Sequence, residues 1–252
     1  MCESDRASRT SPRQPSTHRS AHSANLLGHS GRVPLYSLNL MNPNRRNVYL
    51  YVLDSLADWE IGFITAELRS GRYLKNEGAL TLTLIGATLD PVTTMGGISL
   101  TPERRVGEID FEKGDAVILP GADTWMDGSH LDVLRLAPDL TRAGVTVAAI
   151  CGATVALAGT GALDTRRHTS NDRGFLALAC PEYSGDAFYE EAPVVVDGQL
   201  ITATGLAPLE FAHALFRHLE VMHPAVLAAW YRLYETQDGR HFQTLMAALT
   251  PD

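Results

Sequence analysis

Short, continuous apolar runs alternate with helical segments along most of this chain, and this alternation constrains the fold more than any other feature of the sequence. Residues 47–53, 80–86, 116–119 and 145–150 are rich in β-branched, aliphatic or aromatic side chains. A strand that helices cover on both faces has this composition. Strands that alternate with helices build a parallel sheet through right-handed crossovers. The sequence therefore predicts an α/β fold, a three-layer α/β/α sandwich with a mostly parallel sheet.

Helical periodicity and glycine turns supply the remaining elements of this prediction. Two hairpins are expected, because Gly96-Gly97 interrupts the apolar run at 92–101 and Asp197-Gly198 interrupts the one at 193–203. The first of them is a small β-hairpin beside the main sheet. Apolar positions at a 3.6-residue period predict helices at 58–70, 129–143 and 153–159, and near 207–221 and 224–235.

The basic charge of the chain is concentrated before residue 47. The formal net charge is −8, but residues 1–46 carry seven Arg, no Lys and two acidic side chains, a net charge of +5. The segment also holds eight Ser and has no periodicity, which is typical of disorder. We expect residues 1–46 to be a disordered tail or an extension upstream of a true start at Met41, with a transit peptide or a basic arm as alternatives. One domain then occupies 47–240, and 241–252 form a C-terminal tail.

Composition excludes several classes of protein. The sequence pI of about 5.6 argues against a broad basic face that binds nucleic acid. The chain has no run of 18 apolar residues, so no membrane span is expected. The three cysteines, Cys2, Cys151 and Cys180, are too scattered for a disulfide framework or a CxxC metal site. We therefore expect a cytoplasmic protein that holds no metal and binds neither nucleic acid nor membranes.

Cys151 lies at the most informative junction in the sequence. The buried run 145–150 passes directly into Cys151-Gly152 and the helical residues 153–159, with small side chains around the turn. This is the pattern of a nucleophile elbow. A cysteine at a helix N-terminus faces free N–H groups and the positive end of the helix dipole, both of which lower a thiol pKa. The pattern predicts a reactive thiolate, although a buried structural cysteine is an equally simple interpretation of the spacing alone.

Several motifs together resemble the ThiJ/PfpI superfamily, which has a class I glutamine amidotransferase-like, flavodoxin-like fold. The motifs are Leu119-Pro120-Gly121, Ala149-Ile150-Cys151-Gly152-Ala153 and Asp58-Trp59-Glu60. A later Ala203-Thr204-Gly205, which precedes a helix containing Glu210, is similar too. The resemblance extends over nearly all of residues 47–222. It implies that Cys151 is a functional thiol.

The resemblance also implies roles for the residues around this thiol. Cys151 corresponds to the elbow nucleophile and Glu60 to the carboxyl group that contacts it. An ionised Glu60 would raise the thiol pKa, whereas a protonated one donates a hydrogen bond to the sulfur, so we predict a neutral Glu60 at pH 7. The backbone N–H groups of Ala122 and Gly152 would form the oxyanion hole. Gly121 and Trp125 would border the pocket, although a core position for the Trp125 ring is an equally simple expectation.

The third catalytic member is where the sequence departs from the family pattern. Relatives place a His either directly after the nucleophile, where this chain has Gly152, or in a later segment similar to residues 166–171. Aligned on that segment, the expected His falls on Asn171, and His168 lies three residues earlier. Side chains alternate along a strand, so only one of the two can face Cys151. His168 is the candidate base, and Asn171 is the alternative, which hydrogen-bonds but cannot act as a base.

Two functions are compatible with these residues. The first is a cysteine-dependent hydrolase or lyase, of protease-, glyoxalase- or deglycase-like type, that acts on a small carbonyl or amide substrate without a cofactor. The second is a non-catalytic oxidative-stress or redox-sensing protein in which Cys151 is oxidised. Loss of the His would count against proteolysis and amide hydrolysis. The resemblance further implies a homodimer.

Overall fold

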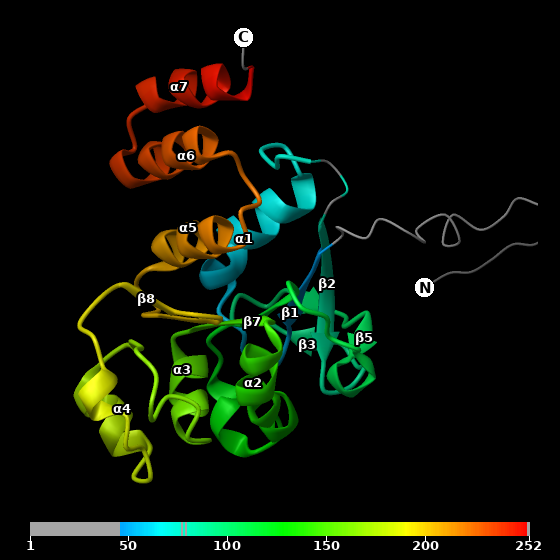
Figure 1. Ribbon diagram of the computed structural model, residues 1–252. Helices are drawn as coiled ribbons and strands as arrows, with labels where there is room; N and C mark the ends of the chain where they lie inside the picture. The colour runs from blue at the N-terminus through cyan, green and yellow to red at the C-terminus, as the bar shows by residue number, and fades with distance from the viewer. Residues whose placement is uncertain (1–45, 77, 79, 251–252) are drawn as a thin grey trace, which may run out of the picture. The chain divides into compact units, whose positions relative to one another are not determined.

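A seven-stranded sheet is the centre of the computed structural model, which describes residues 46–76, 78 and 80–250 (Figure 1). The expected tail at 1–46 therefore lies outside the described residues, except for Arg46, which opens the first strand. The strand order is β5-β2-β1-β6-β7-β9-β8. All neighbours pair in parallel except β8 and β9. The strands are β1 (Arg46–Tyr51), β2 (Leu80–Gly86), β5 (Arg104–Arg105), β6 (Ala116–Leu119), β7 (Thr146–Ile150), β8 (Val194–Asp197) and β9 (Leu200–Ala203).

The central strands form where the sequence predicts them, because their residues are buried on both faces of the sheet. Every residue of β6, β7 and β9 is buried. A separate antiparallel pair, β3 (Val92–Thr93) and β4 (Ser99–Leu100), is the small hairpin expected around Gly96-Gly97. The predicted α/β class, with a mostly parallel sheet and a small hairpin, is confirmed.

Helices cover both faces of the sheet, which gives the three layers. Figure 1 shows α1, α5, α6 and α7 on one side and α2 and α3 on the other. Within the described residues, short 3₁₀ helices lie in the connections, namely η2 (Val106–Glu108), η3 (Asp123–Asp127) and η4 (Asp186–Phe188). The α-helices are α1 (Asp58–Ser70), α2 (Leu131–Ala143), α3 (Gly152–Ala158), α4 (Arg173–Ala179), α5 (Pro208–His218), α6 (Pro224–Thr236) and α7 (Arg240–Leu249). None of the helices in this described part of the chain is long and apolar enough to cross a bilayer.

A buried carboxylate fixes α1 against α6. Glu67 is 1% exposed, and its Oε1 accepts hydrogen bonds from the Trp230 indole at 3.0 Å and from an Arg72 guanidinium nitrogen at 2.5 Å. The other oxygen accepts from Arg72 Nε at 2.8 Å. A buried carboxylate is tolerated only when its oxygens are paired in this way. The contact therefore holds in place the helix whose first turn carries Glu60.

Three elements differ from the sequence-based expectation. Strand β5 has only two residues, which is too short for a periodic signal. Helix α4 has seven residues and exposes Phe175 and Leu178, so it lacks a clear apolar face. Helix α7 lies in the stretch that we expected as a C-terminal tail, and it buries Leu245 completely. The α7 helix forms because apolar residues recur at helical spacing from Phe242 to Leu249.

Candidate active site

The main chain at Cys151 adopts the strained turn that the sequence predicts. Cys151 joins β7 to α3 with φ 58° and ψ −125°, a conformation that few residues other than glycine adopt. Its amide donates to the Ala203 carbonyl at 3.0 Å, and its own carbonyl accepts from the Thr154 hydroxyl at 2.6 Å. These bonds hold the turn from both sides. The side chain is therefore presented at the carboxyl end of β7, where open parallel sheets place their binding sites.

Two glycines allow other segments to approach the sulfur closely. A Cβ on Gly205 would lie 2.8 Å from Cys151 Sγ and 3.1 Å from Glu60 Oε1. A Cβ on Gly121 would lie 2.8 Å from Cys151 Cβ and 2.7 Å from Glu60 Oε2. Distances under 3.0 Å are too short for carbon to occupy without displacement. The site thus requires glycine at both positions, and these glycines close it around the thiol and the carboxyl group.

Glu60 points from the first turn of α1 into this enclosed space. Its side chain is 0% exposed, and Oε2 accepts a hydrogen bond from the Gly121 amide at 2.6 Å. Among the residues that the structure describes, no group satisfies hydrogen-bond geometry with Oε1. Burial raises the pKa of Glu60, which favours the protonated acid. Hydrogen bonds from the Gly121 amide and the Cys151 thiol oppose this rise without reversing it, so the direction of the shift supports the prediction of a neutral Glu60. Because the Gly121 amide occupies Oε2, Oε1 is the oxygen placed to carry the proton.

The expected fall in the pKa of Cys151 needs correction. Burial raises the thiol pKa, and so does the nearby Glu60 carboxyl group, whereas hydrogen bonds from the Asn171 side chain and the Gly152 amide lower it. The helix N-terminus does supply an N–H group, but closure of the site removes the thiol from water. Two acidic groups this close cannot both ionise easily. The thiolate is therefore favoured only in the state in which Glu60 keeps its proton.

Asn171, and not His168, lies against the sulfur. Asn171 Nδ2 donates to Cys151 Sγ at 3.1 Å. Its Oδ1 accepts from the Gly205 amide at 2.7 Å, with the Thr204 hydroxyl at 3.4 Å. Because the Gly205 amide can only donate, the amide group of Asn171 must turn its NH₂ toward the sulfur. The sequence motif Ala203-Thr204-Gly205 marked this turn, but it gave no indication that it orients Asn171.

The assignment of His168 as the base is wrong, because its ring is buried elsewhere. The side chain is 0% exposed, with Nδ1 2.6 Å from the Arg166 carbonyl and Nε2 2.6 Å from the Tyr183 hydroxyl. The carbonyl can only accept, so Nδ1 carries the hydrogen and Nε2 accepts from the tyrosine. Residue 168 also forms an isolated parallel bridge with Tyr189. Both ring nitrogens are thus occupied, and burial lowers the pKa of His168.

The two backbone amides predicted to form an oxyanion hole lie near each other. Gly152 is the first residue of α3, and its amide hydrogen-bonds to the Cys151 thiol. A Cβ built on Gly152 would lie 3.6 Å from the Ala122 nitrogen. Within the described part of the chain, the Ala122 amide donates to no protein group. Both N–H groups are therefore compatible with the predicted role, which remains a prediction.

Trp125 lies beneath this loop and does not border an open pocket. The ring is 3% exposed, its Nε1 donates to the Pro120 carbonyl at 2.6 Å, and it stacks on Tyr51 with centroids 5.6 Å apart. Its Cδ1 would be 3.6 Å from a Cβ on Gly152. The core interpretation of Trp125 therefore holds, and the ring supports the loop that carries Ala122.

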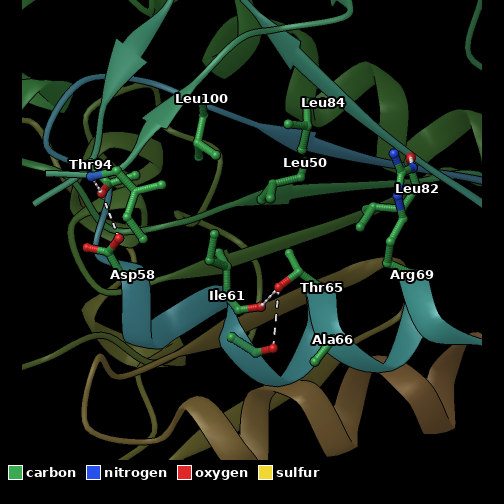
Figure 2. Close-up of a pocket in the computed structure, with 12 residues that line it drawn as sticks. Leu50, Asp58, Ile61, Thr65, Ala66, Arg69, Leu82, Leu84, Thr94 and Leu100 are labelled. Carbon is green, nitrogen blue, oxygen red and sulfur yellow. Dashed lines mark hydrogen bonds between the residues drawn. The ribbon is translucent and has the colours of Figure 1, made fainter. Parts of the chain in front are cut away.

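A separate cavity of about 490 Å³ lies beside α1 and includes neither Cys151 nor Glu60 (Figure 2). Asp58 at one end accepts hydrogen bonds from the Thr94 hydroxyl and the Gly96 amide, both at 2.6 Å. Arg69 at the other end donates to the Leu82 carbonyl at 3.0 Å. Leucine side chains from β1, β2 and β4 and the side of α1 that points toward those strands form most of the wall (Figure 2). The cavity shares α1 with the thiol site but uses a different face of that helix.

Comparisons with known proteins agree with this geometry. The profile of the DJ-1/PfpI family matches residues 46–218. A relative from Bacillus subtilis (strain 168), named "Uncharacterized protease YoaZ", is 44% identical over 202 residues, which cover 80% of this chain and 96% of that protein. A thiJ/pfpI family protein from Bacillus anthracis has a crystal structure similar at a TM-score of 0.78 and 41% identity, covering 81% of this chain and 97% of that one. The DJ-1 superfamily protein Atu0886 from Agrobacterium tumefaciens follows, with a TM-score of 0.66, 29% identity and coverage of 76% and 98%.

Proposed function

Because this chain belongs to the DJ-1/PfpI family, we propose that it is a cysteine-dependent hydrolase or lyase that acts on a small carbonyl substrate. One observation carries the proposal: Cys151 occupies a strained elbow between a buried carboxyl group and an amide donor. Strain of this kind at a cysteine, enclosed beside a titratable partner, is typical of a reactive site.

The proposed chemistry uses the single proton that Cys151 and Glu60 share. The Cys151 thiolate adds its electron pair to the carbonyl carbon of an aldehyde, and the carbon–oxygen π bond breaks toward oxygen. The amides of Ala122 and Gly152 would stabilise the negative oxygen. Glu60 then gives its proton to that oxygen, which produces a hemithioacetal on Cys151 and a Glu60 carboxylate. The net charge of the pair remains −1 throughout.

The placement of Asn171 instead of a histidine at the sulfur favours carbonyl chemistry over proteolysis. Amide hydrolysis requires a proton for the leaving amine and a base for the incoming water, and His usually does both. Among the described neighbours of Cys151, Glu60 is the titratable partner, and Asn171 cannot transfer a proton. Two relatives carry the word "protease" in their names, but both are called uncharacterized. We therefore propose an aldehyde substrate before a peptide.

A direct comparison of substrates tests this proposal. Wild type and Cys151→Ala should be assayed with methylglyoxal and with amide and peptide substrates. We expect turnover of methylglyoxal that depends on Cys151 and little turnover of peptides. If wild type turns over none of these compounds while Cys151 oxidises readily, the enzyme proposal fails and the redox function takes its place.

The redox alternative is favoured by the donors around the sulfur. Asn171 Nδ2 and the Gly152 amide both donate toward Cys151, and a protonated Glu60 would add a third donor. Donors of this kind stabilise an oxidised, negatively charged sulfur as well as a thiolate. Intact mass after mild peroxide treatment distinguishes the outcomes, because a stable gain of oxygen at Cys151 in a catalytically silent protein supports a sensor.

A homodimer is also part of the proposal, on the strength of the family resemblance. Exposed apolar side chains on and beside α1, namely Trp59, Met95 and Ile98, are 47–56% exposed and suit a protein contact. Light scattering after gel filtration should give twice the mass of one chain, and a single-chain mass would remove the dimer from the proposal.

A further inference from the structure

The loops around Cys151 expose large apolar side chains. Leu206 follows Gly205, which touches the sulfur, and it is 93% exposed. Met126, in η3 beyond the Ala122 loop, is 61% exposed. Single exposed apolar residues are ordinary, but these two lie in segments that follow the carboxyl ends of β6 and β9, the edge at which open parallel sheets place their binding sites.

The same loops offer no free cation. The described segments 54–60, 120–128, 151–152, 171–174 and 204–207 contain one basic residue, Arg173. Its guanidinium binds both carboxylate oxygens of Asp186 at 2.6 Å and the Asp186 carbonyl at 3.1 Å.

Acidic side chains, by contrast, directly follow two groups of the site. Asp123 is next to Ala122 and Asp172 is next to Asn171, and both are exposed. The Cys151–Glu60 pair itself holds one negative charge when the thiolate forms. An anionic substrate would therefore approach negative charge and find no counter-ion in these described loops.

We propose that the site selects uncharged electrophiles that carry an apolar substituent, that it discriminates against carboxylate-bearing analogues, and that Leu206 contacts the apolar substituent. This inference rests on the proposed function and names its substrate class. We choose Leu206 because it directly follows Gly205, where an added Cβ would lie 2.8 Å from Sγ, and because its side chain is 93% exposed. Burying that surface against a substrate is favourable.

Steady-state kinetics with matched aldehydes form the first test. Phenylglyoxal and glyoxylate are both aldehydes with a second carbonyl group next to the aldehyde. Phenylglyoxal is neutral and carries an apolar ring, whereas glyoxylate carries a carboxylate. We expect kcat/KM for phenylglyoxal to exceed that for glyoxylate by at least about tenfold. Leu206→Ser should lower kcat/KM for phenylglyoxal by about fivefold and leave that for glyoxylate unchanged. Phe242→Ser, a similar change at an exposed apolar residue on α7, should alter neither value.

Thiol alkylation provides a second test that does not require turnover. The Cys151 thiolate displaces iodide from iodoacetamide or iodoacetate, so a carbon–sulfur bond forms and iodide leaves. The two reagents differ chiefly in one negative charge. Relative to N-acetylcysteine, the protein should prefer iodoacetamide by about tenfold, and Asp123→Asn should reduce that preference about two- to threefold. Cys151→Ala supplies the background from the other cysteines.

The outcomes separate the inference from the proposed function. If no aldehyde is turned over but the preference for iodoacetamide persists, the enzyme proposal fails and the charge selectivity remains. If glyoxylate is used as well as phenylglyoxal, or if the alkylation ratio equals that of the free thiol, the selectivity inference is overturned. A change in oligomeric mass in Leu206→Ser, with the substrate ratio unchanged, would make Leu206 an interface residue and would also overturn it.

Discussion

Glu60→Gln tests whether the carboxyl group beside the thiol is neutral. Gln keeps an oxygen to accept from the Gly121 amide, and it presents an NH₂ group where a protonated Glu60 would present its O–H. If Glu60 is already neutral when the thiolate forms, the variant should titrate Cys151 within about half a pKa unit of wild type. Glu60→Ala removes the donor altogether and should raise the thiol pKa by about one unit.

The distance between Cys151 and Glu60 sets the size of the pKa change expected if Glu60 is instead ionised. A Cβ on Gly205 would be 2.8 Å from Cys151 Sγ and 3.1 Å from Glu60 Oε1, so these two atoms are no more than about 6 Å apart. Two negative charges at that distance repel by about 3 kcal/mol at an effective dielectric constant near 20, or about two pKa units. If Glu60 ionised before Cys151, the Glu60→Gln variant would therefore titrate at least about two units below wild type.

Ultraviolet absorbance of the thiolate against pH measures this directly, with Cys151→Ala as the blank. Glu210→Gln is a matched control, because Glu210 also lies in the first turn of a helix, α5, but is not a neighbour that shifts the Cys151 pKa. We expect its titration to overlay wild type. A titration curve for Glu60→Gln about two units below that of wild type would refute a neutral Glu60 and, with it, the proton transfer proposed for the reaction.

Three further predictions follow from the same contacts. Glu67→Gln leaves Arg72 without a carboxylate partner. Because the Arg72 guanidinium is half exposed and water screens part of the interaction, we expect the free energy of unfolding in urea to fall by only about 2 kcal/mol. An unchanged urea midpoint would contradict the buried contact. Gly205→Ala places a methyl group against Cys151 and should slow alkylation of the thiol at least about tenfold, while the circular dichroism spectrum stays that of wild type. An unchanged alkylation rate would mean that the loop moves to accommodate the methyl group. Burial raises the pKa of Glu60 in the folded protein, so its contribution to stability is complete below the ordinary pKa of Glu and is lost as pH rises through the folded pKa. In a Cys151→Ala background, Glu60→Gln should therefore make the free energy of unfolding fall less steeply with pH. Parallel curves for the two proteins would refute the raised pKa.

The elbow at Cys151 could be predicted from the sequence because every residue that forms it is local. Residues 145–159 contain the buried strand, the cysteine, the small residues of the turn and the helix, and the structure places β7 and α3 there. The central strands could be predicted for the same reason, because strands that are buried on both faces appear in the sequence as continuous apolar runs. The two-residue strand β5 could not be predicted, because its pairing with β2 is decided by the neighbouring strand and not by its own residues.

The choice between His168 and Asn171 shows where local reasoning stops. Only one of the two faces the sulfur, as expected, but strand alternation is not the reason, because residues 169–171 form no strand and His168 makes only an isolated bridge. The placement depends on Tyr183 and Tyr189, 15 and 21 positions beyond His168 in the sequence. Tyr183 binds the His168 ring, and Tyr189 pairs with its backbone. These contacts draw His168 into the core and leave Asn171 at Cys151. No periodicity in residues 166–171 encodes that distant pairing.

The same distinction explains why the pKa of Cys151 was expected to move in the wrong direction. The sequence reveals the helix N-terminus, which lowers a thiol pKa, but not the segments that exclude water. Gly121 and Gly205 come from the ends of β6 and β9, and their lack of side chains lets both loops close over the thiol. Reactivity in such a site cannot rest on an easily ionised thiol alone. It depends on the proton being held by Glu60, so the carboxyl group and the glycines that bury it are as necessary to the proposed chemistry as the nucleophile.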